Sequence, residues 1–250
     1  MRIGVQLHPQ HTTVDDLRRA WRRADELGVD TIWTWDHFFP LWGDRDGSHF
    51  EGWSLLAAMA VDTSRARFGI LVTCNTYRNP DLLADMARTI DHLGGGRLIL
   101  GLGAGWFERD YTEYGYPFAT ATKRLHALEE SIHRIQRRLE RLNPPPRGPL
   151  PLLIGGGGEK VTLRLVAQHA DMWNSFGPPE VYAHKNAVLN SWCEKIGRAP
   201  DEIERTVLID PHEVNNITPY QDAGAQHLIV KIGHPFDLDP LTSLLSHRVA

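Results

Sequence analysis

Residues 152–160 read Leu-Leu-Ile-Gly-Gly-Gly-Gly-Glu-Lys and run directly into a helical pattern over 161–170. A short apolar run that ends in glycines and passes at once into a helix is typical of a buried parallel strand followed by its helix. Glycines at such a junction let the main chain approach another group without a Cβ clash. The stretch therefore predicts one strand–helix unit of an α/β sheet.

The same alternation of apolar runs and helical patterns fills the rest of the chain, which favours a parallel sheet with helices outside it. Eight such units fit into 250 residues, and a closed α/β barrel typically takes about 250 residues. We therefore predict the α/β class and a compact (β/α)8 TIM barrel with few insertions, as a single domain over residues 1–250. The predicted strands are 3–7, 31–36, 67–74, 97–103, 150–155, 171–176, 205–209 and 226–232.

Two stretches qualify this assignment. The segment 143–149 contains four prolines and could be an interdomain linker. We interpret it as a stiff loop within one domain, because four units precede it, four follow it, and neither half could close a barrel alone. The seventh unit is the weakest, since residues 211–220 leave room for only a short helix.

The clearest helix is predicted from six apolar residues spaced three and four apart, so that they share one face. The opposite face is basic, but a solvated face is favoured over a nucleic-acid site because the chain carries a net charge of −4. The apolar residues are Leu125, Leu128, Ile132, Ile135, Leu139 and Leu142.

Composition limits the partners and the compartment. Twenty-seven basic and 31 acidic side chains offer no basic footprint for nucleic acid or anionic lipid. No apolar run approaches the roughly 18 residues of a membrane span, and the N-terminus has no signal-peptide pattern. Only Cys74 and Cys193 are present, so a disulfide framework or a thiolate zinc site is not expected. We expect a cytoplasmic protein that acts on a small molecule.

The first candidate binding element is the glycine run itself, formed by Gly155, Gly156, Gly157 and Gly158. A strand that ends in glycines before a helix presents free N–H groups and the positive end of a dipole, which suits a phosphate. Neither the P-loop nor the Rossmann glycine spacing is present. A flexible turn is the alternative, but barrels favour a phosphate site at a late strand–helix loop.

A second glycine run, 101–105, closes the fourth predicted strand. Glycines also mark bulges and close packing, so this signal is weak by itself. Gly103 and Gly105 would nevertheless give the barrel mouth a surface without side chains, on which a flat ring could lie.

Aromatic side chains gather after the second predicted strand, where they make up seven of the residues 33–53, against 9% of the whole chain. Such a loop could form the wall of a site for a planar ligand. Asp36 and His37 lie at the strand end, where barrel enzymes carry catalytic residues. We expect His37 to exchange a proton, although a lone loop histidine is often only structural.

Two other chemistries are less well supported. Acids and histidines between residues 36 and 51 could hold a metal, but the spacing matches neither an EF-hand nor a zinc motif, and no metal is expected. No GxSxG sequence is present, so a nucleophile-elbow hydrolase is not expected.

The chain resembles the luciferase-like monooxygenase superfamily, and specifically its deazaflavin-dependent oxidoreductase branch. The resemblance covers about residues 3–176 in the family's order, with a further match to the last strand at 226–230. Each piece is weak alone, but together they are specific. The matching segments are 27–38, 76–80, 101–106, 154–158 and 170–174.

The resemblance implies a (β/α)8 barrel that binds the deazaflavin coenzyme F-420, or alternatively FMN, at its mouth. Asp36 and His37 would lie beside the redox-active ring, which Val72, Thr73 and Cys74 would support from behind. This strand-three segment often contains a non-prolyl cis peptide in the family. The residues Gly155 to Gly158 would hold the cofactor phosphate, and family members are commonly homodimers.

The expected reaction is hydride transfer between the deazaflavin and a small organic substrate, with His37 as general acid/base and Asp36 orienting it. An FMN-dependent monooxygenase and a flavin-binding carrier or sensor are the alternatives. Trp42, Trp106 and Glu108 are expected in the substrate pocket. Trp106 stands where sugar-phosphate dehydrogenases of this branch carry an acidic proton donor, which argues against sugar-phosphate oxidation.

Overall fold

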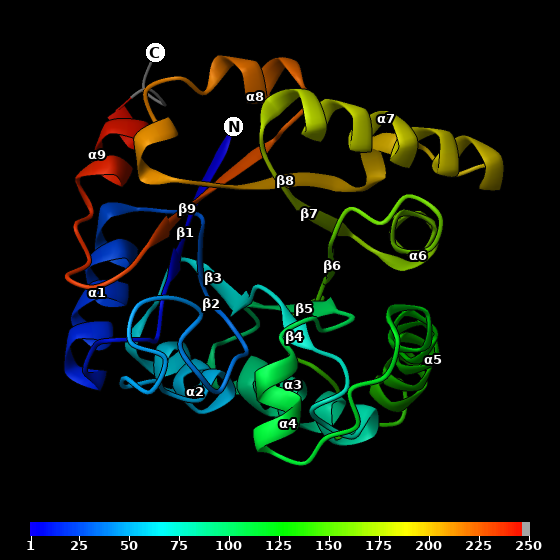
Figure 1. Ribbon diagram of the computed structural model, residues 1–250, viewed down its shortest axis with the longest axis horizontal. Helices are drawn as coiled ribbons and strands as arrows, with labels where there is room; N and C mark the ends of the chain where they lie inside the picture. The colour runs from blue at the N-terminus through cyan, green and yellow to red at the C-terminus, as the bar shows by residue number, and fades with distance from the viewer. Residues whose placement is uncertain (247–250) are drawn as a thin grey trace.

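The computed structural model describes residues 1–246 and confirms the predicted closed barrel of parallel strands (Figure 1). The sheet runs in the order β3-β2-β1-β9-β8-β7-β6-β5-β4 and closes where β3 pairs with β5. Because β3 and β4 are two halves of one strand position, the barrel has eight positions. The strands are β1 (Arg2–Leu7), β2 (Thr31–Thr34), β3 (Arg67–Ile70), β4 (Thr73–Cys74), β5 (Leu98–Gly103), β6 (Leu152–Gly155), β7 (Met172–Phe176), β8 (Glu204–Ile209) and β9 (His227–Ile232).

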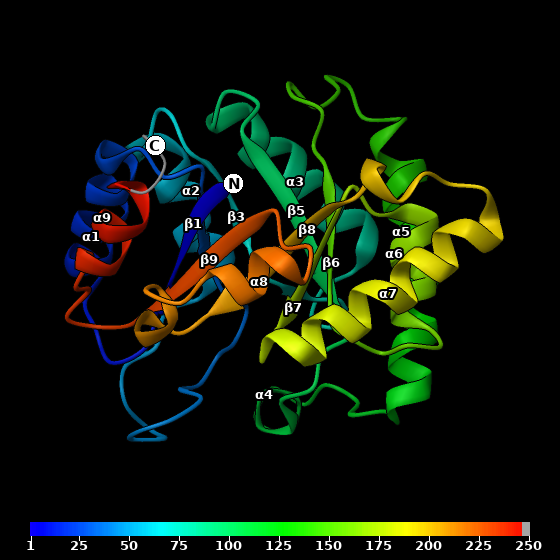
Figure 2. The same cartoon turned by 90° about the horizontal axis from the view of Figure 1, so that it is seen from above.

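Helices surround this sheet on the outside (Figures 1 and 2). Both views place the last helix beside the first, so that the ring of helices closes next to its beginning. The helices are α1 (Val14–Leu27), α2 (Gly52–Asp62), α3 (Pro80–Leu93), α4 (Glu108–Glu113), α5 (Ala121–Leu139), α6 (Thr162–His169), α7 (Pro179–Ile196), α8 (Thr218–Asp222) and α9 (Asp239–Ser246), with 3-10 turns at Pro200–Glu202 and Pro211–Glu213.

The strands are rich in apolar residues because both of their faces are buried. Successive side chains point to opposite faces of a strand, so Leu153 lies inside the barrel while Ile154 packs under the helices. The predicted helix of six apolar residues is α5, although Leu142 lies beyond its end. The inner layer is a separate cluster of Trp33, Leu71, Ile99, Leu153, Met172, Leu208 and Ile229.

A glycine makes room for the largest side chain of the inner layer. A Cβ on Gly69 would lie 2.8 Å from the Trp33 ring and 2.5 Å from the carbonyl oxygen of Ile99. Both distances are shorter than van der Waals contact allows, so only glycine lets the Trp33 indole fill the barrel at this level.

The predicted strand 67–74 is interrupted between Ile70 and Thr73, where the Leu71–Val72 peptide is cis. The main chain of Leu71 still forms hydrogen bonds with neighbouring strands. Its N–H donates to Thr34 O (2.8 Å), and its carbonyl accepts from Gln6 Nε2 (2.8 Å). The interruption therefore displaces Val72 from the ladder without opening the barrel.

Candidate active site

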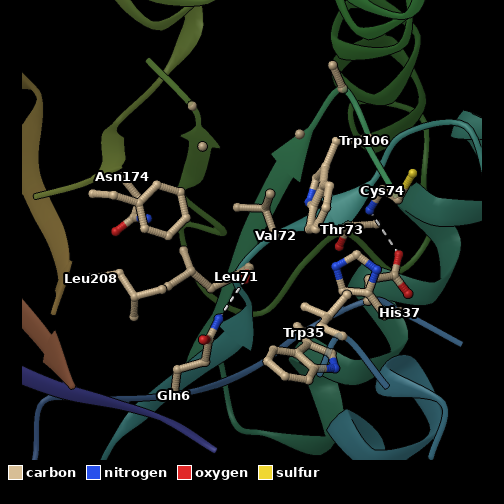
Figure 3. A pocket seen from close by; sticks show the side chains of 18 of the residues that line it. Gln6, Trp35, His37, Leu71, Val72, Thr73, Cys74, Trp106, Asn174 and Leu208 are labelled. Atoms are coloured by element: carbon tan, nitrogen blue, oxygen red, sulfur yellow. Dashed lines mark hydrogen bonds between the residues drawn. The ribbon is translucent and has the colours of Figure 1, made fainter. Parts of the chain in front are cut away.

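A cavity of about 500 Å³ opens at the carboxyl ends of the strands, the end of a TIM barrel that carries the active site. It is lined from β1, from the segment that follows β2, from the interruption between β3 and β4, and from β5 to β9. Figure 3 shows Trp35 and His37 on one side, Asn174 and Leu208 on the other, and Val72 between them. The cavity therefore brings together residues that are far apart in the sequence.

His37 is held in the cavity wall by a residue that sequence reasoning missed. Its Nδ1 lies 2.7 Å from Oδ2 of Asp110, which is fully buried on α4. The same carboxylate accepts from the Tyr77 hydroxyl (2.9 Å) and from the Phe38 N–H (3.1 Å). Burial raises the pKa of Tyr77, so the phenol stays a neutral donor at ordinary pH.

This arrangement decides which ring nitrogen of His37 is available. An ionised carboxylate can only accept hydrogen bonds, so Nδ1 of His37 carries a hydrogen and donates it to Asp110. Within residues 1–246, Nδ1 is the only ring nitrogen of His37 that has a hydrogen-bond partner. Nε2 is therefore available to exchange a proton with a molecule in the cavity. In carboxylate–histidine pairs, one ring nitrogen typically bonds the carboxylate and the other exchanges the proton.

The prediction that Asp36 orients His37 is wrong. The Asp36 carboxylate accepts two hydrogen bonds from Arg78, at 2.6 and 2.9 Å, and one from the Cys74 N–H at 2.9 Å. Adjacent side chains of an extended segment point to opposite sides, so Asp36 turns into the protein while His37 faces Asp110. Burial raises the pKa of Asp36, and Arg78 opposes this shift. Through these hydrogen bonds, Asp36 links the segment that follows β2 to Cys74 on β4.

Trp35 is enclosed by other rings. It stacks on His8 with 4.4 Å between the centroids and meets Trp42 edge-on at 5.3 Å. Burial lowers the pKa of His8 to about 3 and that of His49, which accepts from the Trp35 indole, to about 4. Both histidines are therefore neutral at ordinary pH and serve as packing partners of Trp35.

The floor of the cavity has the shape expected under a flat ring. Val72 fits between two glycines: a Cβ on Gly103 would lie 2.5 Å from its Cγ2, and one on Gly155 would lie 2.9 Å from its Cγ1. Beside it, the buried hydroxyl of Thr73 has no hydrogen-bond partner in the described part of the chain. Gly105 has φ +78°, and a Cβ there would lie 2.1 Å from the Tyr111 hydroxyl oxygen.

The first glycine run splits into two parts. Gly155 and Gly156 line the cavity, and the Gly156 N–H is used in a hydrogen bond to Asn174 O (3.0 Å). Gly157 and Gly158 continue away from the floor toward α6, and within residues 1–246 their N–H groups have no acceptor. These two donors suit an anion at the edge of the cavity.

The family model for luciferase-like monooxygenases matches residues 1–213. This chain belongs to that family. An uncharacterised protein of Mycobacterium tuberculosis is 28% identical over 220 residues, which are 82% of this chain and 75% of that protein. An F-420-dependent glucose-6-phosphate dehydrogenase of Amycolatopsis mediterranei is 26% identical over 231 residues, which are 84% of this chain and 68% of the relative.

The solved structures that resemble this luciferase-like enzyme share its fold. An F-420-dependent secondary alcohol dehydrogenase superposes with a TM-score of 0.85 at 16% identity, and the match covers 100% of this chain and 98% of that one. An EDTA monooxygenase of Chelativorans superposes with a TM-score of 0.81 at 14% identity, covering 99% and 94% of the two chains.

Of the predicted substrate-pocket residues, Trp42 and Trp106 line the cavity of this luciferase-like enzyme, whereas Glu108 is exposed on α4 and outside the lining. The sequence also did not indicate Lys231 on β9, which lines the cavity as well. No helix within residues 1–246 is both long and apolar enough to span a bilayer. In the same residues, no three Cys, His, Asp or Glu side chains gather as metal ligands.

Proposed function

We propose that this protein is an oxidoreductase that transfers hydride between the deazaflavin coenzyme F-420 and a small alcohol or carbonyl compound. The observation that carries the proposal is the free Nε2 of His37, held by Asp110 above a floor made of Val72 and two glycines. Relatives whose names state F-420-dependent dehydrogenation support the choice of cofactor.

The residues present fit such a cofactor. Val72, Gly103 and Gly155 would support the flat ring, and the unpartnered Thr73 hydroxyl would meet a polar ring edge. The free N–H groups of Gly157 and Gly158 would bind the cofactor phosphate. When bound, the deazaflavin supplies a ring carbon that accepts or donates hydride and that disfavours oxygen chemistry.

The protein's own contribution is proton transfer and placement. With an alcohol as substrate, Nε2 of His37 would accept the proton of the hydroxyl group, whose oxygen becomes that of a carbonyl compound; the cofactor would supply the hydride acceptor. The Asp110 carboxylate stabilises the resulting imidazolium through Nδ1–H. In the opposite direction, the imidazolium would return that proton to the oxygen of the carbonyl compound.

Cofactor identity is tested by titrating the purified protein with F-420 and with FMN, followed by absorbance. We expect tight binding of F-420 and its reduction by a secondary alcohol. FMN binding with substrate-dependent oxygen consumption would instead identify a monooxygenase. Retention of F-420 without hydride exchange to any alcohol or ketone would identify a carrier or sensor.

We also propose that two copies of the chain associate, as the family resemblance implies. Exposed apolar side chains, including Val61 on α2 and Leu93 on α3, lie on neighbouring helices and would be covered by a second copy. Light scattering after size exclusion should give about twice the chain mass of 28.3 kDa, and a monomer at micromolar concentration would contradict this.

A further inference from the structure

The rim of the cavity is built from large aromatic side chains that remain open to solvent. Trp106 is 63% exposed, Phe176 is 57% exposed and Trp42 is 51% exposed, although all three line the cavity. They come from three separate parts of the chain: the segment after β5, the end of β7 and the segment after β2. Exposed aromatic groups that converge on one opening mark a place where an apolar molecule binds.

The rim lies next to the proposed proton-transfer residue. The Trp106 ring meets the His37 ring edge-on at 5.6 Å, and Trp35 meets it at 6.0 Å. Trp42 in turn packs edge-on against Trp35. A substrate whose reacting oxygen reaches His37 must therefore place the neighbouring part of its carbon skeleton against these rings.

The cavity offers no unpaired positive charge to an anionic substrate. Among its lining residues, Lys231 is the only lysine or arginine, and Asp36 is the only aspartate or glutamate. Lys231 Nζ lies 2.9 Å from Asp210, and Asp36 is paired with Arg78. The free N–H groups of Gly157 and Gly158 are assigned to the cofactor phosphate, so binding a further phosphate dianion here would require breaking the Lys231–Asp210 pair.

We propose that the substrate is an uncharged secondary alcohol, or the corresponding ketone, with an aromatic or cyclic apolar group next to the reacting carbon. Sugar phosphates are excluded by the same site. The ring of the substrate lies against Trp106 and Trp42, and its oxygen faces Nε2 of His37. This inference rests on the proposed hydride transfer and adds the substrate class to it.

The test compares three substrates with the F-420-loaded protein: 1-phenylethanol, 2-butanol and glucose 6-phosphate. We expect kcat/KM for one enantiomer of 1-phenylethanol to exceed that for 2-butanol by about tenfold or more, since burying a ring against aromatic side chains contributes at least this much. No turnover of glucose 6-phosphate is expected. Turnover of glucose 6-phosphate at a kcat/KM similar to that of 1-phenylethanol would overturn the inference.

The variant Trp106→Ala should reduce the ratio of kcat/KM for 1-phenylethanol to kcat/KM for 2-butanol to about twofold, because it removes the ring that the phenyl group contacts. The matched control is Ile196→Ala, which truncates an exposed apolar side chain at the end of α7 and outside the cavity. The control should leave the ratio unchanged. A Trp106→Ala protein with the parent ratio would contradict the inference.

Calorimetric titration separates this inference from the proposed function. Acetophenone should bind the loaded protein at least about tenfold more tightly than 2-butanone, and Trp106→Ala should remove most of this difference. If hydride transfer is absent but acetophenone still binds more tightly than 2-butanone, the proposed reaction is wrong and the site for an aromatic ring is supported. If hydride transfer occurs but both ketones bind equally, the substrate class is wrong.

Discussion

Nδ1 of His37 and Oδ2 of Asp110 lie 2.7 Å apart, although 73 residues separate them in the chain. The histidine follows β2 and the aspartate lies on α4, a short helix that the sequence pattern did not indicate. The pair engages Nδ1 of His37 and leaves Nε2 without a partner in the described residues. Its expected effect on the reaction can be measured directly.

Replacing Asp110 by Asn should lower turnover by about 10²-fold, because a neutral amide cannot stabilise the imidazolium. The amide can also donate its NH2 group to Nδ1, which moves the ring hydrogen of His37 to Nε2. The measurement is single-turnover hydride transfer at saturating cofactor. The affinity for F-420 should change by less than about threefold. Turnover equal to that of the parent protein would show that His37 does not need this carboxylate.

Replacing His37 by Ala should lower turnover by about 10²–10⁴-fold, while cofactor affinity changes much less. The reason is that, among the described residues that line the cavity, His37 is the only histidine, and burial keeps the pKa of the nearby His8 near 3. If His37 is only structural, its loss will reduce stability or cofactor binding and leave turnover per bound cofactor intact.

Replacing Asp36 by Asn tests a structural role. The change leaves the partly buried Arg78 with Glu51 as its remaining carboxylate, and breaking a buried ion pair typically costs about 3–5 kcal/mol. Denaturant unfolding should show a loss of about 3 kcal/mol. Asp85→Asn, which removes the exposed pair with Arg138, is the control and should cost less than about 1 kcal/mol. Equal stability of both variants would contradict the assignment.

Gly157 allows the phosphate site to be tested by charge alone. A Cβ there would meet Ser175 and Lys185 at 3.5 and 3.6 Å, which is ordinary contact. Gly157→Ala should therefore bind F-420 about as well as the parent protein. Gly157→Asp adds a negative charge and should weaken binding at least about tenfold. Equal affinity of the two folded variants would place the phosphate elsewhere.

The proline-rich segment 143–149 should not release two independently folded halves on limited proteolysis. Arg88 and His92 of α3 bond to the carbonyls of Pro144 and Pro145, at 3.0 and 2.8 Å. Asp91 accepts from the main chain of residues 147 and 148. Because strands from both sides of the segment complete one closed sheet, we propose a single domain. Two stable, separable fragments would disprove it.

The strands were predictable because burial on both faces favours apolar residues along the strand, and each predicted run overlaps an observed strand. The run 67–74 shows where this signal stops. Its residues are as apolar as those of the other strands, yet the ladder breaks at Val72, whose side chain enters a space left by Gly103 and Gly155. That space exists only once three strands are side by side.

The sequence by itself determined the barrel, the glycine-lined floor and the presence of a histidine at a strand end. These features depend on local periodicity, and glycine and proline act through the backbone of their own segment. Only the tertiary structure decided that Asp110 contacts His37, that Asp36 is occupied by Arg78, and that Glu108 stays outside the cavity. Side-chain partners in a barrel are set by the ring of strands and by the loops above it, so no spacing along the chain encodes them.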